Sequence, residues 1–435
     1  MTAEIAIINK NAVALAADSA VTLRDPSASK IYNTANKLFM LSKFEPVGIM
    51  VYGAAEFLGV PLETIIKMYR SRLQSQSFAK LNDYAQDFLH FLESNALLFP
   101  PDKQKASFES IISRFYWAIR CEIDEGIKAE IAKAPVKDDT VKRITEEKIG
   151  EYFKSWSELE YLSSCDVTFE TSLAVSYGDS ITKAIETVFE KLPFQDCVEK
   201  LRNLAALRIT RDHWPESCGL VFAGFGDLDV LPCVKSFVVE AVVHNKVRVS
   251  PTPNLSNDMN EKPIASIMPF GQAEIVYRFI QGIDPEYKKE VRKYLRALLT
   301  KEYPDKLIER FQAGLPEEDR RNALAELIKL GRAIAEDFDS EWGTLEWNKY
   351  VGPVLDIVAD LPKEDLAAMA ESLVNLTSFK RRISREAETV GGPIDVAVVS
   401  KGDGFIWIKR KHYFNKELNP YFFANYYRVR RDGES

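Results

Sequence analysis

The alternation of apolar and polar residues predicts that the chain opens with β structure. Residues 4–8 form a short apolar run, residues 9–11 a polar segment with two asparagines, and residues 12–17 a second apolar run that ends at Asp18. Two apolar runs joined by a polar turn that contains Asn predict a hairpin buried on at least one face. Extended structure is expected to continue through residue 51, with a polar loop at residues 24–29.

Helical periodicity dominates the next part of the chain. Apolar residues at helical spacing predict a helix over residues 57–73, and further helices are expected at 81–97, 108–134 and 141–159. The remaining predicted elements are strands at 167–176, 218–226 and 391–399, a hairpin at 234–249 around Asn245, and helices at 179–207, 271–302 and 303–380. This succession predicts an α+β fold with two sheets packed face to face and helices outside them.

Composition excludes several classes of protein. With 435 residues, of which 46% are hydrophobic and 28% charged, the chain suits two or three domains or one elaborated domain. A net charge of −7 gives no support to nucleic-acid binding. No apolar run approaches the length of a membrane helix, and no secretory leader is expected. Five cysteines without a CxxC pair predict reduced thiols in a cytoplasmic protein, and neither a metal nor a nucleotide cofactor is expected.

Thr2 is the first candidate for chemistry. Removal of Met1 would leave Thr2 as the first residue, and a small side chain at the second position permits that removal. A terminal threonine combines a hydroxyl nucleophile with an α-amine whose reference pKa is about 8, so part of that amine is an unprotonated base near neutral pH. The plain alternative is that Thr2 is the second residue of an unprocessed terminus.

Four segments carry a resemblance to a known family. Thr2 to Asp18, followed by Ser19 and Thr22, resembles the N-terminus of proteasome β-subunits and bacterial ring proteases, which are N-terminal-nucleophile (Ntn) hydrolases. Residues 36–41 resemble the strand with the family's catalytic lysine, 48–56 its glycine-containing strand end, and 391–399 its late Gly-Gly-x-Ile-Asp-Val strand. The resemblance implies one domain, a four-layer αββα sandwich, with helical insertions at about 75–160 and 303–380. The residues at 405–435 are expected to form an aromatic and basic C-terminal tail.

The resemblance also implies roles for single residues. Thr2 is the expected nucleophile, Lys37 the cation beside its hydroxyl, and Asp18 the acid that orients and charges the lysine. Backbone N–H groups at Tyr52 and Gly53 are expected to bind the oxyanion of acyl transfer. Plain alternatives stay open: a turn-capping Asp18, a solvated edge lysine in place of a catalytic Lys37 (with Lys30 a weaker candidate for that role), and a Gly53 needed only for close packing.

Two parts of the family pattern are replaced in this chain. The family's Gly-Ser-Gly segment before its third helix corresponds to residues 269–272, where Gln272 is the polar substitute and Ser266 lies upstream. Its Arg-Asp-x-x-Ser-Gly-Gly segment corresponds to 385–392, where Ala387 and Val390 take the aspartate and serine positions. The candidate supporting residues are Ser19, Thr22, Gln272, Glu386, Glu388 and Thr389, and each of the last three could also be plain surface polarity.

The sequence therefore predicts a cytoplasmic threonine-type hydrolase that cleaves amide bonds, with peptides as the expected substrates, through an acyl-enzyme on Thr2. The alternatives are a small-amide Ntn hydrolase and a non-catalytic scaffold of the same fold. The aromatic residues at 413–427 are expected to pack on their own subunit or, preferably, to form a contact in a homo-oligomer, because proteasome-like subunits assemble into rings. An ATPase partner has no support in the sequence, and no membrane partner is expected.

Overall fold

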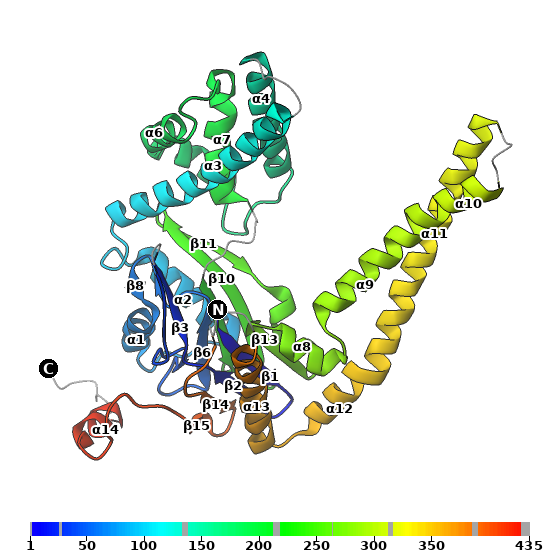
Figure 1. Ribbon diagram of the computed structural model, residues 1–435. Helices are drawn as coiled ribbons and strands as arrows, with labels where there is room; N and C mark the ends of the chain where they lie inside the picture. The colour runs from blue at the N-terminus through cyan, green and yellow to red at the C-terminus, as the bar shows by residue number, and fades with distance from the viewer. Residues whose placement is uncertain are drawn as a thin grey trace. The chain divides into compact units, whose positions relative to one another are not determined.

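The computed structural model describes residues 2–25, 28–132, 138–211, 218–262, 264–311, 316–384 and 390–427. These residues form an α+β structure with two multi-stranded antiparallel sheets (Figure 1). The chain divides into two compact units. Unit 1 comprises Met1–Ala35 and Asp258–Ser435, and unit 2 comprises Asn36–Asn257.

The sheet of unit 1 is built around the N-terminal hairpin. β1 (Ala3–Ile8) pairs with β2 (Val13–Ala17), which confirms the predicted hairpin. β13 (Ser266–Gly271), β14 (Asp395–Ser400) and β15 (Gly404–Lys409) complete the order β13-β1-β2-β14-β15. The hairpin strands are buried along their whole length, because Glu4 is the only residue in them that is neither small nor apolar.

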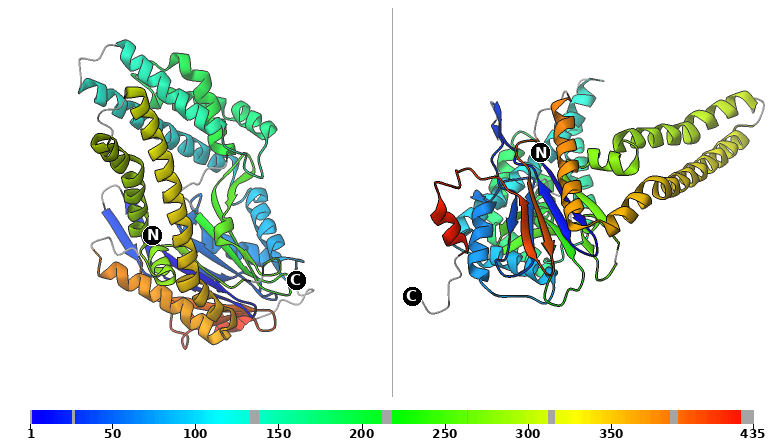
Figure 2. Two further views of the ribbon diagram at one scale, coloured as in Figure 1. Left: turned by 90° about the vertical axis from the view of Figure 1, so that its right-hand side faces the viewer. Right: turned by 90° about the horizontal axis from the view of Figure 1, so that it is seen from below.

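Helices cover one face of this sheet. α13 (Lys363–Arg382) packs against β1, β2 and β14, and its apolar residues share one core with α8 (Glu274–Gln281) and those strands. Between these helices the chain forms α9 (Pro285–Ala297), a π-helical segment (Leu298–Glu302), α10 (Tyr303–Phe311), α11 (Glu317–Glu346), a second π-helical segment (Trp347–Val351) and α12 (Gly352–Asp360). In unit 1, α9 to α11 form a long two-helix arm (Figures 1 and 2).

The sheet of unit 2 has the order β11-β10-β9-β6-β5. The strands along this path are β5 (Leu38–Met40), β6 (Val47–Tyr52), β9 (Cys218–Gly224), β10 (Cys233–Val243) and β11 (Lys246–Pro251). α1 (Leu62–Leu73) and α2 (Leu81–Ser94) share a core with these strands. His244 and Asn245 both have positive φ, as the favoured two-residue hairpin turns require, which confirms the predicted hairpin.

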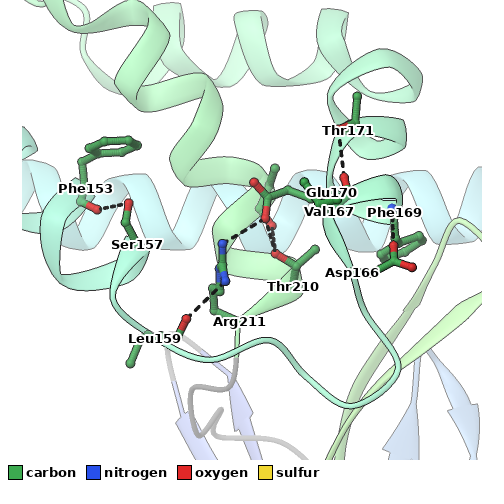
Figure 3. A network of polar contacts seen from close by, with 11 residues as sticks. Phe153, Ser157, Leu159, Asp166, Val167, Phe169, Glu170, Thr171, Thr210 and Arg211 are labelled. Atoms are coloured by element: carbon green, nitrogen blue, oxygen red, sulfur yellow. Dashed lines mark hydrogen bonds and ion pairs between the residues drawn. The ribbon is translucent and has the colours of Figure 1, made fainter.

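Five helices of unit 2 form a separate core. They are α3 (Pro101–Ile131), α4 (Asp138–Ser157), α5 (Val167–Ser176), α6 (Gly178–Val188) and α7 (Val198–Thr210), with a 3₁₀ turn (Gln195–Cys197) before α7. After α7, Arg211 donates to Leu159 O and Glu170, and Thr210 also donates to Glu170 (Figure 3). These contacts join the end of α7 to α5 and to the loop before α5.

A buried ion-pair cluster lies next to this network in unit 2. Arg208 of α7 makes hydrogen bonds to both carboxylate oxygens of Glu240 on β10. Arg248 of β11, 3% exposed, lies 2.9 Å from the same carboxylate. Removing one of these residues would leave a buried charge without its partner, which is costly. The cluster therefore holds α7 against the β10–β11 hairpin.

Several predicted elements were wrong. Residues 167–176 form helix α5 and not a strand, because Asp166 caps its first turn by accepting from Phe169 N, 2.8 Å away. Gly271 ends strand β13 and does not start a helix, since pairing with β1 holds residues 266–271 extended and α8 begins at Glu274. The predicted tail at 405–435 stays a prediction, and its first residues belong to the edge strand β15.

Other segments differ in their boundaries. The predicted polar loop at 24–29 is largely a hairpin of β3 (Val21–Asp25) and β4 (Ala28–Tyr32). The helix predicted from residue 57 begins at Leu62, after the short strands β7 (Glu56–Phe57) and β8 (Val60–Pro61). The two-residue strand β12 (Asn257–Asp258) lies at the boundary of the units, and α14 (Pro420–Tyr427) is the last described helix. The proposed helical insertions stay predictions; α2 and α13 lie within them and pack on the sheets of their units.

The described part of the chain agrees with two features expected from composition. All five cysteines are free, and Cys197, Cys218 and Cys233 are buried. No described helix is long and apolar enough to cross a membrane.

Candidate functional site

Thr2 lies directly before β1, an interior strand of its sheet, and is 4% exposed. Its carbonyl oxygen accepts a hydrogen bond of 2.9 Å from Gln272 N, because the pairing of Ala3 with Gly271 brings residue 272 opposite Thr2. Its hydroxyl donates to Glu4 Oε2 at 2.7 Å. Residues two apart on a strand share a face, so Thr2 and Glu4 point in the same direction.

Gly271 gives Thr2 the space that it occupies. The residue has a φ of +74°, which favours glycine. A Cβ atom at this position would overlap the carbonyl oxygen of Thr2 and would lie 2.8 Å from its Oγ1. The end of β13 therefore needs glycine both for its backbone conformation and for the close approach of the candidate nucleophile.

Asp18 is 1% exposed and follows β2. Its Oδ1 accepts from Ala3 N at 3.2 Å, and its Oδ2 accepts from Ala20 N at 3.3 Å and from Gly391 N at 2.9 Å. Its own N–H donates to Ala3 O. The carboxylate thus joins the start of β1, the turn after β2 and the segment before β14, which is the backbone-capping role left open by the sequence. The predicted role toward a lysine stays a prediction.

Two supporting candidates lie beside these residues. Ser19 is fully buried, and its hydroxyl donates to Pro393 O while its N–H donates to Gly391 O. Gln272 is 3% exposed and its side-chain oxygen accepts from Arg381 of α13. Unit 1 therefore gathers Thr2, Asp18, Ser19 and Gln272 at one end of its sheet.

The other supporting candidates are placed elsewhere or lie outside the described residues. Ser266 pairs with Ile8, at the opposite end of β1 from Thr2. Thr22 lies in β3, opposite Ile31 of β4. Glu386, Glu388 and Thr389 are outside the part of the chain that the structure describes.

Unit 2 holds the remaining candidates. Lys37 directly precedes β5, is 4% exposed, and accepts from Val51 N at 2.8 Å through its carbonyl oxygen. Tyr52 ends β6 opposite Gly219, whose lack of a Cβ leaves room for the tyrosine ring. Gly53 follows, exposed and with a φ of +84°. Lys37, Tyr52 and Gly53 therefore lie at the same end of the β5–β6 pair.

Glu4 is a residue that the sequence interpretation missed. It was counted within an apolar run, yet it is fully buried and accepts the hydrogen bond of the candidate nucleophile. The signal was present, because burying a lone carboxylate in an apolar strand is costly unless it has a partner. Its spacing of two residues from Thr2 also places both side chains on one face of the strand.

The arrangement in unit 1 offers the elements of nucleophilic chemistry. A hydroxyl within hydrogen-bond distance of a carboxylate has a proton acceptor in reach. The described residues contain no group of three or more His, Cys, Asp or Glu side chains that could hold a metal ion.

Comparison with models of known protein families found no match for this chain, and comparison with curated protein sequences found none either.

Proposed function

We propose that this chain is an Ntn hydrolase of the threonine type, which cleaves amide bonds, in peptides first of all, through an acyl-enzyme on Thr2 after removal of Met1. The observation that supports this most directly is the hydrogen bond of 2.7 Å from the Thr2 hydroxyl to the buried Glu4 carboxylate. The main-chain contacts of Thr2 with Gln272, and the space left by Gly271, support a fixed position for the residue.

In the proposed reaction Thr2 Oγ1 attacks the substrate carbonyl carbon, and its proton passes to the α-amine of the same residue. The tetrahedral intermediate collapses to an ester on Thr2, and the leaving amine takes the proton. Water then hydrolyses the ester, which releases the acid and restores the hydroxyl. Glu4 fixes the rotamer of the hydroxyl and polarises its O–H bond.

Three residues keep the roles that the resemblance implies, as part of the same proposal. Lys37 supplies a positive charge that favours the alkoxide, and N–H groups at Tyr52 and Gly53 bind the oxyanion. The exposed position of Gly53 and its positive φ are compatible with an accessible strand end.

The four-layer αββα sandwich is the fold that we propose with this function. It is supported by the internal organisation of each unit. Unit 1 has an antiparallel sheet with α8 and α13 in its core, and unit 2 has one with α1 and α2. Each unit thus contains one helical layer and one sheet layer, which are the halves of such a sandwich.

A non-catalytic protein of the same fold is the second candidate, and two observations favour it. Thr2 is only 4% exposed, and Asp18 accepts three backbone hydrogen bonds that suit a structural role. Under this alternative Thr2 and Glu4 form a buried polar pair without a substrate.

The experiment is intact-mass analysis of the purified full chain, before and after reaction with a peptide epoxyketone, which needs both the hydroxyl and the amine of a terminal threonine. The proposal expects loss of Met1 and one adduct, absent in Thr2→Ala and retained in Thr2→Ser. Lys37→Ala and Glu4→Gln are expected to slow labelling. A retained Met1, or a trimmed chain that never labels, would overturn the hydrolase and leave the non-catalytic candidate.

Substrate class needs a separate measurement. Turnover of peptide amides labelled with a fluorophore, in preference to short acyl amides, would support a peptide hydrolase. The reverse preference would assign the site to small amides and would contradict the peptide part of the proposal.

A further inference from the structure

The two-helix arm of unit 1 has a well-defined inner seam. Arg292 Nε lies 2.7 Å from Asp339 Oδ1, and Lys288 pairs with Glu346. At Gly331 the α11 backbone approaches the carbonyl oxygen of Leu299 so closely that a Cβ would overlap it. These contacts show that α9 and α11 run antiparallel and are in register over the length of α9 (Figures 1 and 2).

The seam continues past the π-helical segment. On α10 the buried residues are Pro304 and Ile308. Leu299 is the last inward residue before them, because it lies against Gly331 of α11. The next inward residue is therefore five positions later, whereas an α-helix repeats a face every three or four. A π-helical turn accommodates one extra residue, and Leu298–Glu302 is such a segment. The inward positions on this side of the arm are therefore 288, 292, 295, 299, 304 and 308.

The residues that precede the inward positions form one face of the arm. Each helical residue is turned by about 100° from the next, and in an antiparallel pair the residues that precede inward ones project to the same side of both helices. On α9 and α10 Tyr287, Tyr294 and Tyr303 are 65%, 65% and 54% exposed. With the partly buried residues of the same stripe the set is Tyr287, Val291, Tyr294, Leu298, Tyr303 and Leu307.

α11 contributes a matching stripe. Its inward positions 331, 335, 339 and 346 are each preceded by an apolar residue. Leu330, Ile334 and Leu345 are 56%, 45% and 49% exposed, and Phe338 is partly buried. We call the two stripes together the apolar face of the arm.

The opposite side of the arm has a different character. The residues that follow the inward positions are polar or charged, with Trp347 as the exception. They are Lys289, Lys293, Arg296, Thr300, Asp305, Glu309, Arg332, Glu336 and Ser340. The arm is therefore amphipathic as a two-helix unit, and the apolar face is the side that lacks a covering layer within the described arm.

The size of the apolar face suits a protein contact. The stripe from residue 287 to residue 307 is about 30 Å long at 1.5 Å per residue, and two helices are about 20 Å wide. The face thus offers about 600 Å² per copy, or about 1,200 Å² for a pair, which is the lower end of specific interfaces. Exposed apolar patches of this size mark interaction sites.

We propose that the apolar face binds the same face of a second copy of this chain, about a two-fold axis parallel to the arm. This symmetry stacks α9 of one copy on α11 of the other at the same level. Because the seam contacts join residue 288 to 346 and residue 299 to 331, both stripes span the same levels, so apolar residues meet apolar residues. The product is a four-helix bundle in which neighbouring helices are antiparallel.

The net charges of the paired helices suit this arrangement. α9 contains five basic and two acidic residues, whereas residues 330–346 of α11 contain one basic and five acidic residues. Most of these side chains lie in the seam or on the polar side, so the apolar contact carries the proposal and the charges add only a long-range preference. A two-fold axis perpendicular to the arm would instead place α9 on α9, a helix of the same net charge. The proposal does not depend on the chain being a hydrolase.

The experiment is sedimentation velocity of the full chain between about 1 and 100 µM, with a matched pair of variants. Ile334→Glu places a charge on the apolar face, and Ser340→Glu places the same charge on the polar face of the same helix. The expected result is weaker self-association by about 30-fold or more for Ile334→Glu, as for a central interface residue, and no change for Ser340→Glu.

A second variant guards against misfolding. Tyr294 is 65% exposed, so Tyr294→Arg is tolerated by the monomer and is expected to weaken association as Ile334→Glu does. Circular dichroism checks the helix content of each variant. A wild-type chain that is monomeric at 100 µM would overturn the proposal, and so would an oligomer that persists unchanged in both Ile334→Glu and Tyr294→Arg.

Discussion

Replacing Asp18 by Ala tests the role of the buried carboxylate in unit 1. The substitution removes the acceptor of three backbone N–H groups, those of Ala3, Ala20 and Gly391, at 3.2, 3.3 and 2.9 Å. These groups belong to three different segments, and the carboxylate is 1% exposed. The loss therefore releases the start of β1 and the segment before β14 at the same time.

The magnitude follows from the hydrogen bonds. An unsatisfied buried donor costs about 1–3 kcal/mol. Two of the three hydrogen bonds are long, and a water molecule can enter the vacated space, so we take about 1 kcal/mol for each hydrogen bond lost. Asp18→Ala is therefore expected to lower the free energy of unfolding by about 3 kcal/mol. Asp18→Asn keeps one acceptor oxygen but turns an amide donor toward one N–H group, which predicts a smaller loss of about 1–2 kcal/mol.

The assay combines urea unfolding with amide hydrogen exchange read by mass spectrometry. Exchange separates unit 1 from unit 2, which a single unfolding curve does not do for a chain of two units. Peptides covering β1 and β14 are expected to lose protection in Asp18→Ala, while peptides of β9 and β10 in unit 2 keep theirs. The matched control is Asp403→Ala, because Asp403 makes a half-exposed ion pair with Lys363 and such pairs contribute little to stability.

Two outcomes would refute this reasoning. If both Asp18 variants unfold at the urea concentration of the wild type, the carboxylate does not hold the three segments. If Asp18→Asn is as unstable as Asp18→Ala, the charge of the side chain and not its acceptor geometry is what stabilises the fold.

Three further predictions concern other sites. Gly271→Ala is expected to destabilise the chain by about 1–3 kcal/mol in urea and to slow epoxyketone labelling. Alanine disfavours the positive φ of this position, and its Cβ atom would displace Thr2. Wild-type stability together with a wild-type labelling rate would contradict the site geometry. Burial raises the pKa of the Glu240 carboxyl, but its two arginine partners outweigh burial and hold this pKa below the usual value. The ionised carboxylate therefore stabilises the fold above its unfolded pKa, about 4.5, and this contribution is lost as the pH falls through the folded pKa. Unfolding at pH 3 and pH 6 should therefore differ less in Glu240→Gln than in the wild type, and an equal difference would exclude this linkage. Burial raises the pKa of Cys218 to about 12, so iodoacetamide at pH 8 should modify the exposed Cys121 and spare Cys218, as peptide mapping of the native protein would show; rapid labelling of Cys218 would contradict its burial.

Local patterns were sufficient where an element carries its own signal. The N-terminal hairpin was predicted from two apolar runs around an Asn-containing turn, and the hairpin at Asn245 from β-branched alternation. In both cases strand, turn and partner are neighbours in sequence, so local propensity and final pairing agree. The helices α2, α3 and α4 were predicted for the same reason, because their apolar stripes repeat over several turns.

Local patterns were misleading where distant contacts decide the conformation. Residues 266–271 are extended because they pair with β1, 258 to 268 positions earlier in the chain, and nothing within the segment signals that partner. α5 has the β-branched composition of a strand, but the cap at Asp166 and burial of Phe169 and Leu173 against α7 make it a helix. Tertiary packing outweighs propensity in both segments.

The sequence by itself determined which residues are candidates for chemistry: Thr2 with its potential amine, Asp18 after an apolar strand, and Lys37, Tyr52 and Gly53 around a second strand pair. Only the tertiary structure decided that Glu4 and Gly271 surround Thr2 and that Asp18 accepts three backbone hydrogen bonds. It alone decided that the apolar residues of the arm share one face. The physical reason is that a hydrogen bond or a close approach depends on pairing register and on seams between helices, which join residues far apart in the chain, whereas the chemical identity of a side chain is local.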